Sequence, residues 1–271
     1  MKIAVTGGGG FLGQATIRAA EAAGHTAWAF DRADGNDVLG DLAGLDSADT
    51  VIHLAGMLGT AELFDQAEQA VEANVVGTLR ILQWCAKTGA SYVGITMPDS
   101  SWANVYQATK LCASRLASAW HHSRGVPVSH VRAFNAYGPG QKHGDGHPRK
   151  IVPAFATAAW RREPIEIWGS GMQTVDLVHA DDVGRILVAA TSLGDDQVID
   201  AGTGHAVTVL EVAKYVARYC GSTARPRHLP MRDGETPDTS IIARGEGWEW
   251  IDYRVPLFEW PMLNATIDSY A

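Results

Sequence analysis

A glycine-rich turn near the N-terminus constrains the fold of this chain more than any other feature. Residues 2–6 have the apolar pattern of a strand, and residues 13–23 have that of an Ala-rich helix. Between them lies TGGGGFLG, residues 6–13, which satisfies both GxGxxG and GxxGxxG. Glycines allow a tight turn and a close approach of the backbone to a pyrophosphate, whose charge is favourable at a helix N-terminus. The turn therefore predicts a dinucleotide site at the start of a Rossmann-type fold.

Short apolar runs alternate with helical patterns through residue 133. This alternation indicates βαβ units, and hence a parallel sheet with helices on both faces. The predicted helices are residues 13–23, 68–88 and 106–123, and the predicted strands are 2–6, 26–30, 50–54, 92–96 and 128–132. We predict an α/β protein with a doubly wound parallel sheet in residues 1–133, to which 175–200 return. Residues 134–174 and 201–271 are expected to form a smaller, irregular α+β cap that binds substrate.

Composition excludes several classes of protein. The 271 residues are 46% hydrophobic and 19% charged, as in globular domains. Lys plus Arg number 22 and Asp plus Glu 30, so the net charge of −8 argues against a nucleic-acid partner. No apolar run is long enough to cross a bilayer and no signal peptide precedes the first strand, so we expect no membrane partner and a cytoplasmic location.

The cysteines and histidines do not predict a metal site. The three cysteines are far apart and form no CxxC pair, which argues against both disulfides and zinc. His143 and His147 are close in sequence, but no third ligand accompanies them.

An acidic residue follows the second predicted strand at the position where Rossmann folds bind ribose. Asp31 lies 21 residues after Gly10 and can accept hydrogen bonds from the adenosine ribose hydroxyls while repelling a 2′-phosphate. This favours NAD, although the neighbouring Arg32 is compatible with that phosphate. The alternative role for Asp31 is that of a turn-capping residue.

A tyrosine and a lysine stand four residues apart on the helix that follows the strand ending at Thr96. Tyr106 and Lys110 therefore share one helix face. A nearby ammonium favours the phenolate and lowers the pKa of a tyrosine, which makes the phenol a usable base.

Further motifs follow in a fixed order along the chain. They are GDL at 40–42, HLAG at 53–56, NVVGT at 74–78, RAFNAYGPG at 132–140, WGSG at 168–171, HADD at 179–182 and RDGE at 232–235. With the glycine turn and the Tyr-Lys pair, this series resembles the extended short-chain dehydrogenase/reductase family, in particular its NAD-dependent nucleotide-sugar epimerases and dehydratases. The resemblance covers nearly the whole chain.

The resemblance implies a set of functional residues. The expected NAD contacts are Gly7, Gly10, Phe11, Leu12, Asp31, Arg32, Asp41, Leu42, Leu54, Ala55, Gly56, Asn74, Tyr106 and Lys110. Asn135 and Arg232 are expected to bind the substrate's diphosphate. The implied partner is a nucleoside-diphosphate sugar, and the implied assembly is a homodimer through the helices at 68–88 and 106–123.

Two departures from the family pattern affect the site. The family places a catalytic Ser or Thr just after the strand ending at Thr96, but Met97 and Pro98 occupy that place here. Thr96, Ser100 and Ser101 can replace it; we favour Thr96 for catalysis because a strand end is rigid, and assign Ser100 and Ser101 to substrate binding.

The second departure is Val175, where the family has a phosphate-binding Arg. Arg232 or a basic group of the preceding loop is expected to compensate; that group comprises Lys142, His143, His147, Arg149 and Lys150. Trp102 is a candidate for the sugar or base pocket.

The resemblance implies a 4-epimerase acting on a UDP-glucose/galactose or uronate type of sugar through a transient 4-keto intermediate. Tyr106 would take the C4 hydroxyl proton, and Lys110 would hold the nicotinamide ribose. Three alternatives remain open: a 4,6-dehydratase or decarboxylase, a net sugar reductase, and a non-catalytic dinucleotide-binding sensor.

Overall fold

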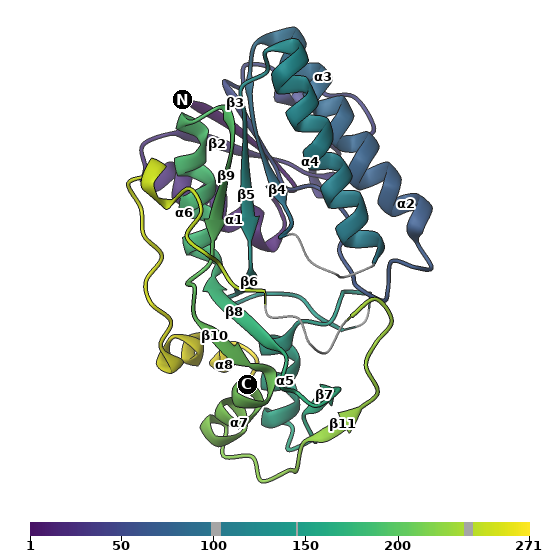
Figure 1. The fold of residues 1–271 in the computed structure, drawn as a ribbon, viewed down its shortest axis with the longest axis vertical. Helices are drawn as coiled ribbons and strands as arrows, with labels where there is room; N and C mark the ends of the chain where they lie inside the picture. The colour runs from purple at the N-terminus through teal and green to yellow at the C-terminus, as the bar shows by residue number, and fades with distance from the viewer. Residues whose placement is uncertain (99–103, 145, 236–240) are drawn as a thin grey trace.

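The computed structural model describes residues 1–98, 104–144, 146–235 and 241–271, which form two lobes (Figure 1). The upper lobe contains a six-stranded parallel sheet in the order β2-β1-β3-β4-β5-β9. Its strands are β1 (Lys2–Thr6), β2 (Thr26–Phe30), β3 (Thr50–His53), β4 (Ser91–Thr96), β5 (Val128–Ala133) and β9 (Asp195–Ala201). The reversal of strand order beside β1 is that of a doubly wound sheet, so the predicted fold class is confirmed.

Helices cover both faces of this sheet. Helices α3 and α4 pack together on one face, and α1 and α6 pack together on the other (Figure 1). The helices of the upper lobe are α1 (Phe11–Ala22), α2 (Ala67–Val71), α3 (Gly77–Thr88), α4 (Val105–Arg124) and α6 (Ala180–Ala189). No helix among the described residues is long and apolar enough to cross a membrane.

The helix predicted over residues 68–88 is interrupted. Between α2 and α3 the chain forms a π-helical segment, η3 (Glu72–Val76). Apolar periodicity predicts that a segment is helical, but it does not reveal a local change in the hydrogen-bonding step. The segment η3 packs against α4.

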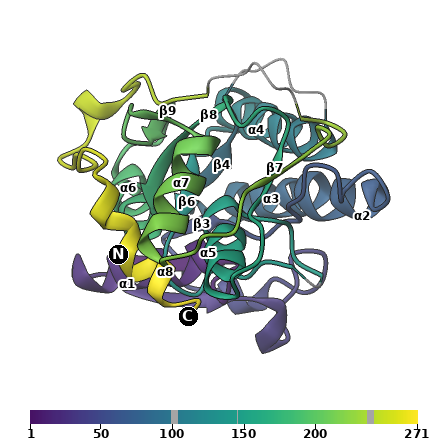
Figure 2. The ribbon, with the colours of Figure 1, turned by 90° about the horizontal axis from the view of Figure 1, so that it is seen from below.

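The lower lobe holds two small sheets and the helices α5, α7 and α8 (Figure 2). One sheet has the order β10-β8-β6 and the other pairs β11 with β7. The bounds are β6 (Asn135–Tyr137), α5 (Ile151–Trp160), β7 (Glu166–Trp168), β8 (Thr174–His179), β10 (Ala206–Thr208), α7 (Val209–Tyr219), β11 (Arg227–Leu229) and α8 (Asn264–Asp268). The three-residue strands β6, β10 and β11 are too short to leave a periodic signal in the sequence, and they were not predicted.

The chain crosses between the lobes more than once. Of the segment expected to return to the upper lobe, β9 pairs with β5 in the main sheet, whereas β8 pairs with β6 and β10 in the lower lobe. The domain limits remain a prediction. The carboxyl ends of the parallel strands β4 and β5 face the lower lobe (Figure 1).

Candidate active site

The glycine turn has the geometry of a backbone cradle. Gly7 has φ +69°, a conformation that L side chains rarely adopt. A Cβ on Gly13 would lie 2.2 Å from the Gly7 carbonyl oxygen, so only glycine lets α1 pack this close to the turn. Gly10 is the N-cap of α1, makes no side-chain cap, and is followed by no acidic residue in the first turn. These features fit the pyrophosphate of a dinucleotide, with residues 7–12 around it.

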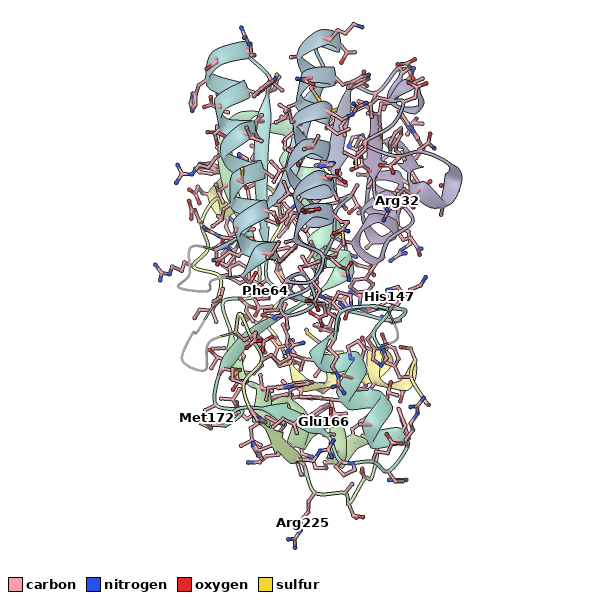
Figure 3. All side chains as sticks on the ribbon, turned by 90° about the vertical axis from the view of Figure 1, so that its right-hand side faces the viewer. Arg32, Phe64, His147, Glu166, Met172 and Arg225 are labelled. Carbon is pink, nitrogen blue, oxygen red and sulfur yellow. The ribbon has the colours of Figure 1, made fainter. Side chains whose placement is uncertain are left out.

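Asp31 caps a turn and also contacts the glycine turn, while its contact with ribose stays a prediction. One carboxylate oxygen accepts a hydrogen bond from the Gly9 N–H at 3.0 Å, and the other caps a 3₁₀ turn through Ala33 N–H at 3.0 Å. The carboxylate thus stands beside the glycine turn, where a ribose would be bound. Arg32 is exposed and lies on the outer surface of the upper lobe (Figure 3).

Residues 38–42 include the expected NAD contacts Asp41 and Leu42. This segment is held by a residue that the sequence motifs do not include. Arg80 on α3 donates to the carbonyl oxygens of Val38 (2.9 Å) and Gly40. Asp41 caps the following turn through the Ala43 N–H at 3.1 Å, and Leu42 packs against the apolar core.

Asn74 joins the loop after β3 to α4, the helix that carries Tyr106 and Lys110. Its side chain accepts from Met57 N–H at 2.7 Å and donates to Met57 O at 3.1 Å and to Thr109 Oγ1 at 3.0 Å. Thr109 precedes Lys110 on α4. A Cβ on Gly56 would lie 2.5 Å from the Asn74 amide oxygen, which explains the glycine there. In this structure Asn74 therefore positions protein groups, and its contact with NAD stays a prediction.

Tyr106 and Lys110 lie in the first two turns of α4. Asn104 caps this helix by accepting from Gln107 N–H at 2.8 Å. Burial raises the pKa of Tyr106 to about 12 and lowers the pKa of Lys110 to about 8. The expected lowering of the tyrosine pKa by Lys110 is therefore wrong for this structure, because the cost of burying a phenolate is larger than its attraction to the ammonium.

The hydroxyl of Thr96 is engaged away from Tyr106. Ser114 Oγ donates to Thr96 Oγ1 at 2.7 Å and lies 3.0 Å from Lys110 O. Ser114 is eight residues beyond Tyr106, about 12 Å along the helix axis. This contact ties β4 to α4, and the catalytic role of Thr96 stays a prediction. Ser100, Ser101 and Trp102 lie outside the described residues.

In the cap, two arginines lie over one indole ring. The guanidinium carbon of Arg149 is 4.7 Å from the Trp168 ring centroid, and that of Arg232 is 4.9 Å. Arg232 also pairs with Glu235 and, at 3.4 Å, with Glu62 of the upper lobe. Within the described parts of the chain, Arg232 Nε and Glu62 Oε2 are buried without a hydrogen-bond partner.

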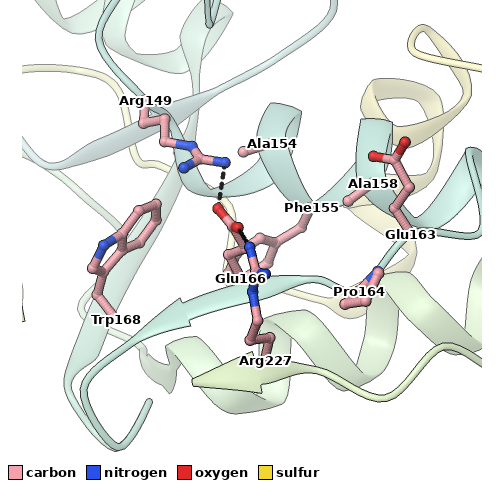
Figure 4. A pocket seen from close by; sticks show the side chains of 9 residues that line it. All are labelled: Arg149, Ala154, Phe155, Ala158, Glu163, Pro164, Glu166, Trp168 and Arg227. Atoms are coloured by element: carbon pink, nitrogen blue, oxygen red, sulfur yellow. Dashed lines mark hydrogen bonds and ion pairs between the residues drawn. The ribbon is translucent and has the colours of Figure 1, made fainter. Parts of the chain in front are cut away.

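Trp168 also borders a pocket of about 300 Å³ between α5 and the β7–β11 sheet (Figure 4). Glu166 lines it and pairs with Arg149 at 2.8 Å and with Arg227. Trp168 was not among the site residues predicted from the sequence. The available signal was its position, at the end of the alternating pattern Ile165-Glu166-Ile167 and before Gly169 and Gly171, where a strand ends.

Val175 is part of the apolar core of the cap. It is 7% exposed and pairs with Val207 across the β8–β10 ladder. The next residue, Asp176, accepts hydrogen bonds from Thr203 and from the backbone of Gly204 and Ala243, so its role is structural.

The basic loop does not act as one group. His143 Nε2 lies 3.1 Å from Thr157 Oγ1, away from Arg232, and His147 lies at the junction of the lobes (Figure 3). Burial lowers the pKa of Lys150, while the Glu62 carboxylate opposes this shift. Arg149 and Lys150 are thus the loop residues near Arg232. Asn135 is half-buried at the start of β6.

A hydrogen bond joins the catalytic helix to the cap. The Asn104 side chain donates to the Gly234 carbonyl oxygen at 3.1 Å, two residues after Arg232. Asn104 itself stands two residues before Tyr106. The glycine turn, the half-buried Tyr106 with the buried Lys110, and the arginines over Trp168 therefore border the junction of the lobes. This combination defines a dinucleotide-dependent enzyme of the short-chain dehydrogenase/reductase class.

Comparison with known proteins gives the family. The sequence profile of the NAD dependent epimerase/dehydratase family matches residues 3–202, and the chain belongs to this family. A UDP-glucuronate 4-epimerase of Thermodesulfobacterium geofontis is 28% identical over 210 residues, which is 71% of this chain and 64% of that protein. A dTDP-glucose 4,6-dehydratase of Streptomyces niveus is 26% identical over 281 residues, 86% of this chain and 82% of that protein.

Solved structures agree with this assignment. MoeE5 in complex with UDP-glucose and NAD is 26% identical, with a TM-score of 0.87 and coverage of 99% of this chain and 98% of the other. The UDP-glucose 4-epimerase of Thermus thermophilus, in complex with NAD, has the same fold (TM-score 0.84, 21% identity, coverage of 100% and 99%). The resemblance predicted from sequence and NAD as the cofactor are confirmed.

Proposed function

We propose that this protein is a 4-epimerase of a nucleoside-diphosphate sugar, of the UDP-glucose/galactose or uronate type. The observation that carries the proposal is the Asn104–Gly234 hydrogen bond. It places the helix bearing Tyr106 and Lys110 against the cap segment bearing Arg232. A substrate bound between them would present its sugar to Tyr106 and its diphosphate to the arginine.

The cofactor end of the site would be held by upper-lobe residues. The glycine turn at residues 7–12 would take the pyrophosphate, and Asp31 the adenosine ribose. Residues 38–42 would border adenine, and Lys110 would hold the nicotinamide ribose. Bound NAD supplies a hydride acceptor that can return the hydride to either face of the sugar.

The nucleotide end would be held by the cap. Arg232 lies over Trp168 and pairs with Glu62 and Glu235, so a phosphate oxygen would take the place of a carboxylate oxygen while the indole ring offers a surface for a base. Arg149 adds a second positive charge beside the same ring. These residues would compensate for Val175, and Asn135 would contribute a further polar contact.

The chemistry would be proton transfer coupled to a reversible oxidation. Tyr106 Oη would take the proton of the sugar C4 hydroxyl as hydride leaves C4, giving a 4-keto sugar. The proton and the hydride would return after the 4-keto sugar has rotated in the site to present its other face. Lys110, one helix turn away, is mainly an ammonium at neutral pH because its pKa is about 8, and it would stabilise the Tyr106 phenolate that accepts this proton. Thr96 remains our assignment for the hydroxyl that would contact the substrate.

The test is a panel of nucleotide sugars followed by NMR with NAD-loaded protein. Interconversion of two C4 epimers without net change in NADH is the expected result. A 4-keto-6-deoxy product or loss of CO₂ would identify a dehydratase or decarboxylase instead. Stoichiometric NAD binding with no turnover of any sugar would contradict the enzyme proposal and favour a sensor.

We also propose a homodimer through α3 and α4. These helices pack together on one face of the sheet (Figure 1), and the adjoining Val71 and Val76 are exposed apolar residues (46% and 39%). Light scattering at micromolar concentration should give twice the mass of the chain, and a monomer would contradict this.

A further inference from the structure

A chain of buried polar side chains in the upper lobe has no part in the chemistry proposed above. Thr6 and His53 end two neighbouring strands, β1 and β3, directly opposite one another in register. Thr6 Oγ1 lies 2.7 Å from His53 Nδ1, and His53 Nε2 lies 3.1 Å from Thr78 Oγ1 on α3. All three residues are 0% exposed. Because unpaired polar groups are costly at such depth, these contacts are strongly constrained.

Counting donors assigns the tautomer of the histidine. Thr6 Oγ1 accepts from the Ala55 N–H at 3.2 Å and, also at 3.2 Å, from the Leu54 N–H that it shares with the Thr6 carbonyl oxygen, so its own proton is directed to His53 Nδ1. Thr78 donates its proton to the Asn74 carbonyl at 2.7 Å, so it accepts from His53 Nε2. The ring is therefore neutral with its proton on Nε2. Burial and the nearby Lys110 charge lower the pKa of His53 to about 3, consistent with this assignment.

The chain continues into the catalytic helix. Asn74 donates from its side chain to Thr109 Oγ1 at 3.0 Å, and Thr109 in turn donates to the carbonyl of Val105 at 2.9 Å. Thr109 lies between Tyr106 and Lys110 in sequence. Asn74 belongs to the π-helical segment η3, and such segments recur at functional sites.

We propose that His53 is a positioning residue, which through Thr78 and Asn74 fixes the first turns of α4 relative to the glycine turn. Its catalytic consequence rests on the role proposed for Tyr106. A hydride acceptor and a proton acceptor must be aligned at the same carbon, and the two groups come from different elements. A neutral chain of hydrogen bonds holds that alignment without adding charge beside Lys110.

A matched pair of Thr→Val variants tests the proposal. Thr78→Val breaks the chain. Thr50, at the other end of β3, is buried like Thr78, and its Oγ1 lies 2.7 Å from Ser91 Oγ. Thr50→Val removes this hydroxyl and serves as the control. We expect comparable losses of Tm. Thr78→Val should also lower kcat by at least about tenfold, because small misplacements of reacting groups are costly. Thr50→Val should change kcat by less than about twofold.

Hydrogen–deuterium exchange gives a readout that does not require activity. Thr78→Val should speed exchange of residues 104–111 by about fivefold or more, and Thr50→Val should leave it unchanged. His53→Gln, whose amide can replace the Nε2–H, should retain more protection and turnover than His53→Asn, which can replace only Nδ1.

The outcomes separate this inference from the proposed function. Equal exchange at 104–111 in the two Thr variants would overturn the positioning role, whatever the turnover. Altered exchange with an unchanged kcat would overturn its catalytic consequence. If the wild type turns over no nucleotide sugar but Thr78→Val still speeds exchange at 104–111, the proposed function fails while the positioning of α4 stands.

Discussion

The two lobes hold their site residues by different physical means. Around α4 in the upper lobe, neutral hydrogen bonds of buried side chains hold the site, as in the contacts of Asn74 with the Met57 backbone and with Thr109. In the cap, charged side chains on loops and short strands pair across the lobe boundary, as Arg232 does with Glu62, and within the cap, as it does with Glu235. Buried neutral bonds are rigid and little affected by salt, whereas partly exposed ion pairs are adjustable and screened.

This difference matches the tasks that the lobes would have. The upper lobe would bind NAD, a single ligand of fixed shape, and a rigid cradle suits it. The cap would bind the variable part of the substrate, and its charges can rearrange around a phosphate. The comparison predicts that changes in the upper lobe alter catalysis and stability, whereas changes in the cap alter substrate affinity.

Replacing the proposed base is expected to have the largest effect. Tyr106→Phe removes only the hydroxyl, so we expect loss of turnover by about 10³-fold, within the range for general acid–base groups. NAD affinity should remain within about threefold, since the ring still packs at the helix start. Steady-state kinetics and NAD titration measure both quantities. Activity close to that of the wild type would remove Tyr106 from the mechanism.

The buried Lys110 ammonium is expected to lower the free energy of unfolding of the protein, although turnover requires it. It is 6% exposed, and no carboxylate among the described residues lies within ion-pair distance of it. Its pKa falls from 10.5 to about 8, so Lys110→Met should raise the free energy of unfolding of cofactor-free protein at pH 7 by on the order of 3 kcal/mol while abolishing turnover.

The pH dependence of this stability follows from the sign of the shift. Between pH 8 and 10.5 the unfolded chain binds the lysine proton and the folded chain does not, so the wild type gains stability as pH rises and the difference from Lys110→Met narrows. Denaturant unfolding of both proteins at pH 7 and at about pH 10 would measure how far this difference in unfolding free energy narrows. A variant less stable than the wild type at pH 7 would contradict this view of Lys110.

Removing the cap arginine should act mainly on substrate affinity. For Arg232→Ala we expect KM for a nucleotide sugar to rise by about 10- to 100-fold, the scale of a charge-assisted phosphate contact, with kcat changed far less. Raising the ionic strength should increase the KM of the wild type more than that of the variant. Arg225→Ala, at the far end of the cap, is the matched control (Figure 3). A loss of kcat alone would place Arg232 in the catalytic step.

The smallest expected effect concerns cofactor choice. Asp31→Asn keeps an acceptor for the Gly9 N–H but loses the negative charge that repels a 2′-phosphate. We expect NAD to bind less than about tenfold more weakly, and NADP to bind more tightly than to the wild type. Titration with both dinucleotides measures this. An unchanged NADP affinity would show that Asp31 acts only as a cap.

Local sequence signals predicted the upper lobe well. The apolar alternation located its strands and helices to within a few residues, because each element has its own period and its own caps. The helices α5 and α7 and the strand β7 of the cap were also predicted, as residues 151–162, 208–220 and 165–168, whereas β6, β10 and β11 were not, since strands of three residues leave little periodic signal. The π-helical turn at Asn74 was invisible for a related reason, because apolar periodicity does not reveal a local change in the hydrogen-bonding step.

The candidate site shows the same division. Motifs selected Tyr106, Lys110 and the glycine turn, whose functions depend on local spacing. They did not select Trp168 or Arg80 as site residues, because the importance of these side chains lies in contacts with residues far away in the sequence. They also gave the wrong direction for the pKa of Tyr106, because burial is a property of the folded lobe.

The sequence by itself determined the fold class, the cofactor and the family, because the glycine turn, the βαβ spacing and the order of motifs are local patterns with few structural solutions. Only the tertiary structure decided how Arg232 lies over Trp168, that Val175 belongs to the core, and that His53 is neutral and linked to the catalytic helix. These properties arise from long-range contacts and from burial, and neither is written in the spacing of residues along the chain.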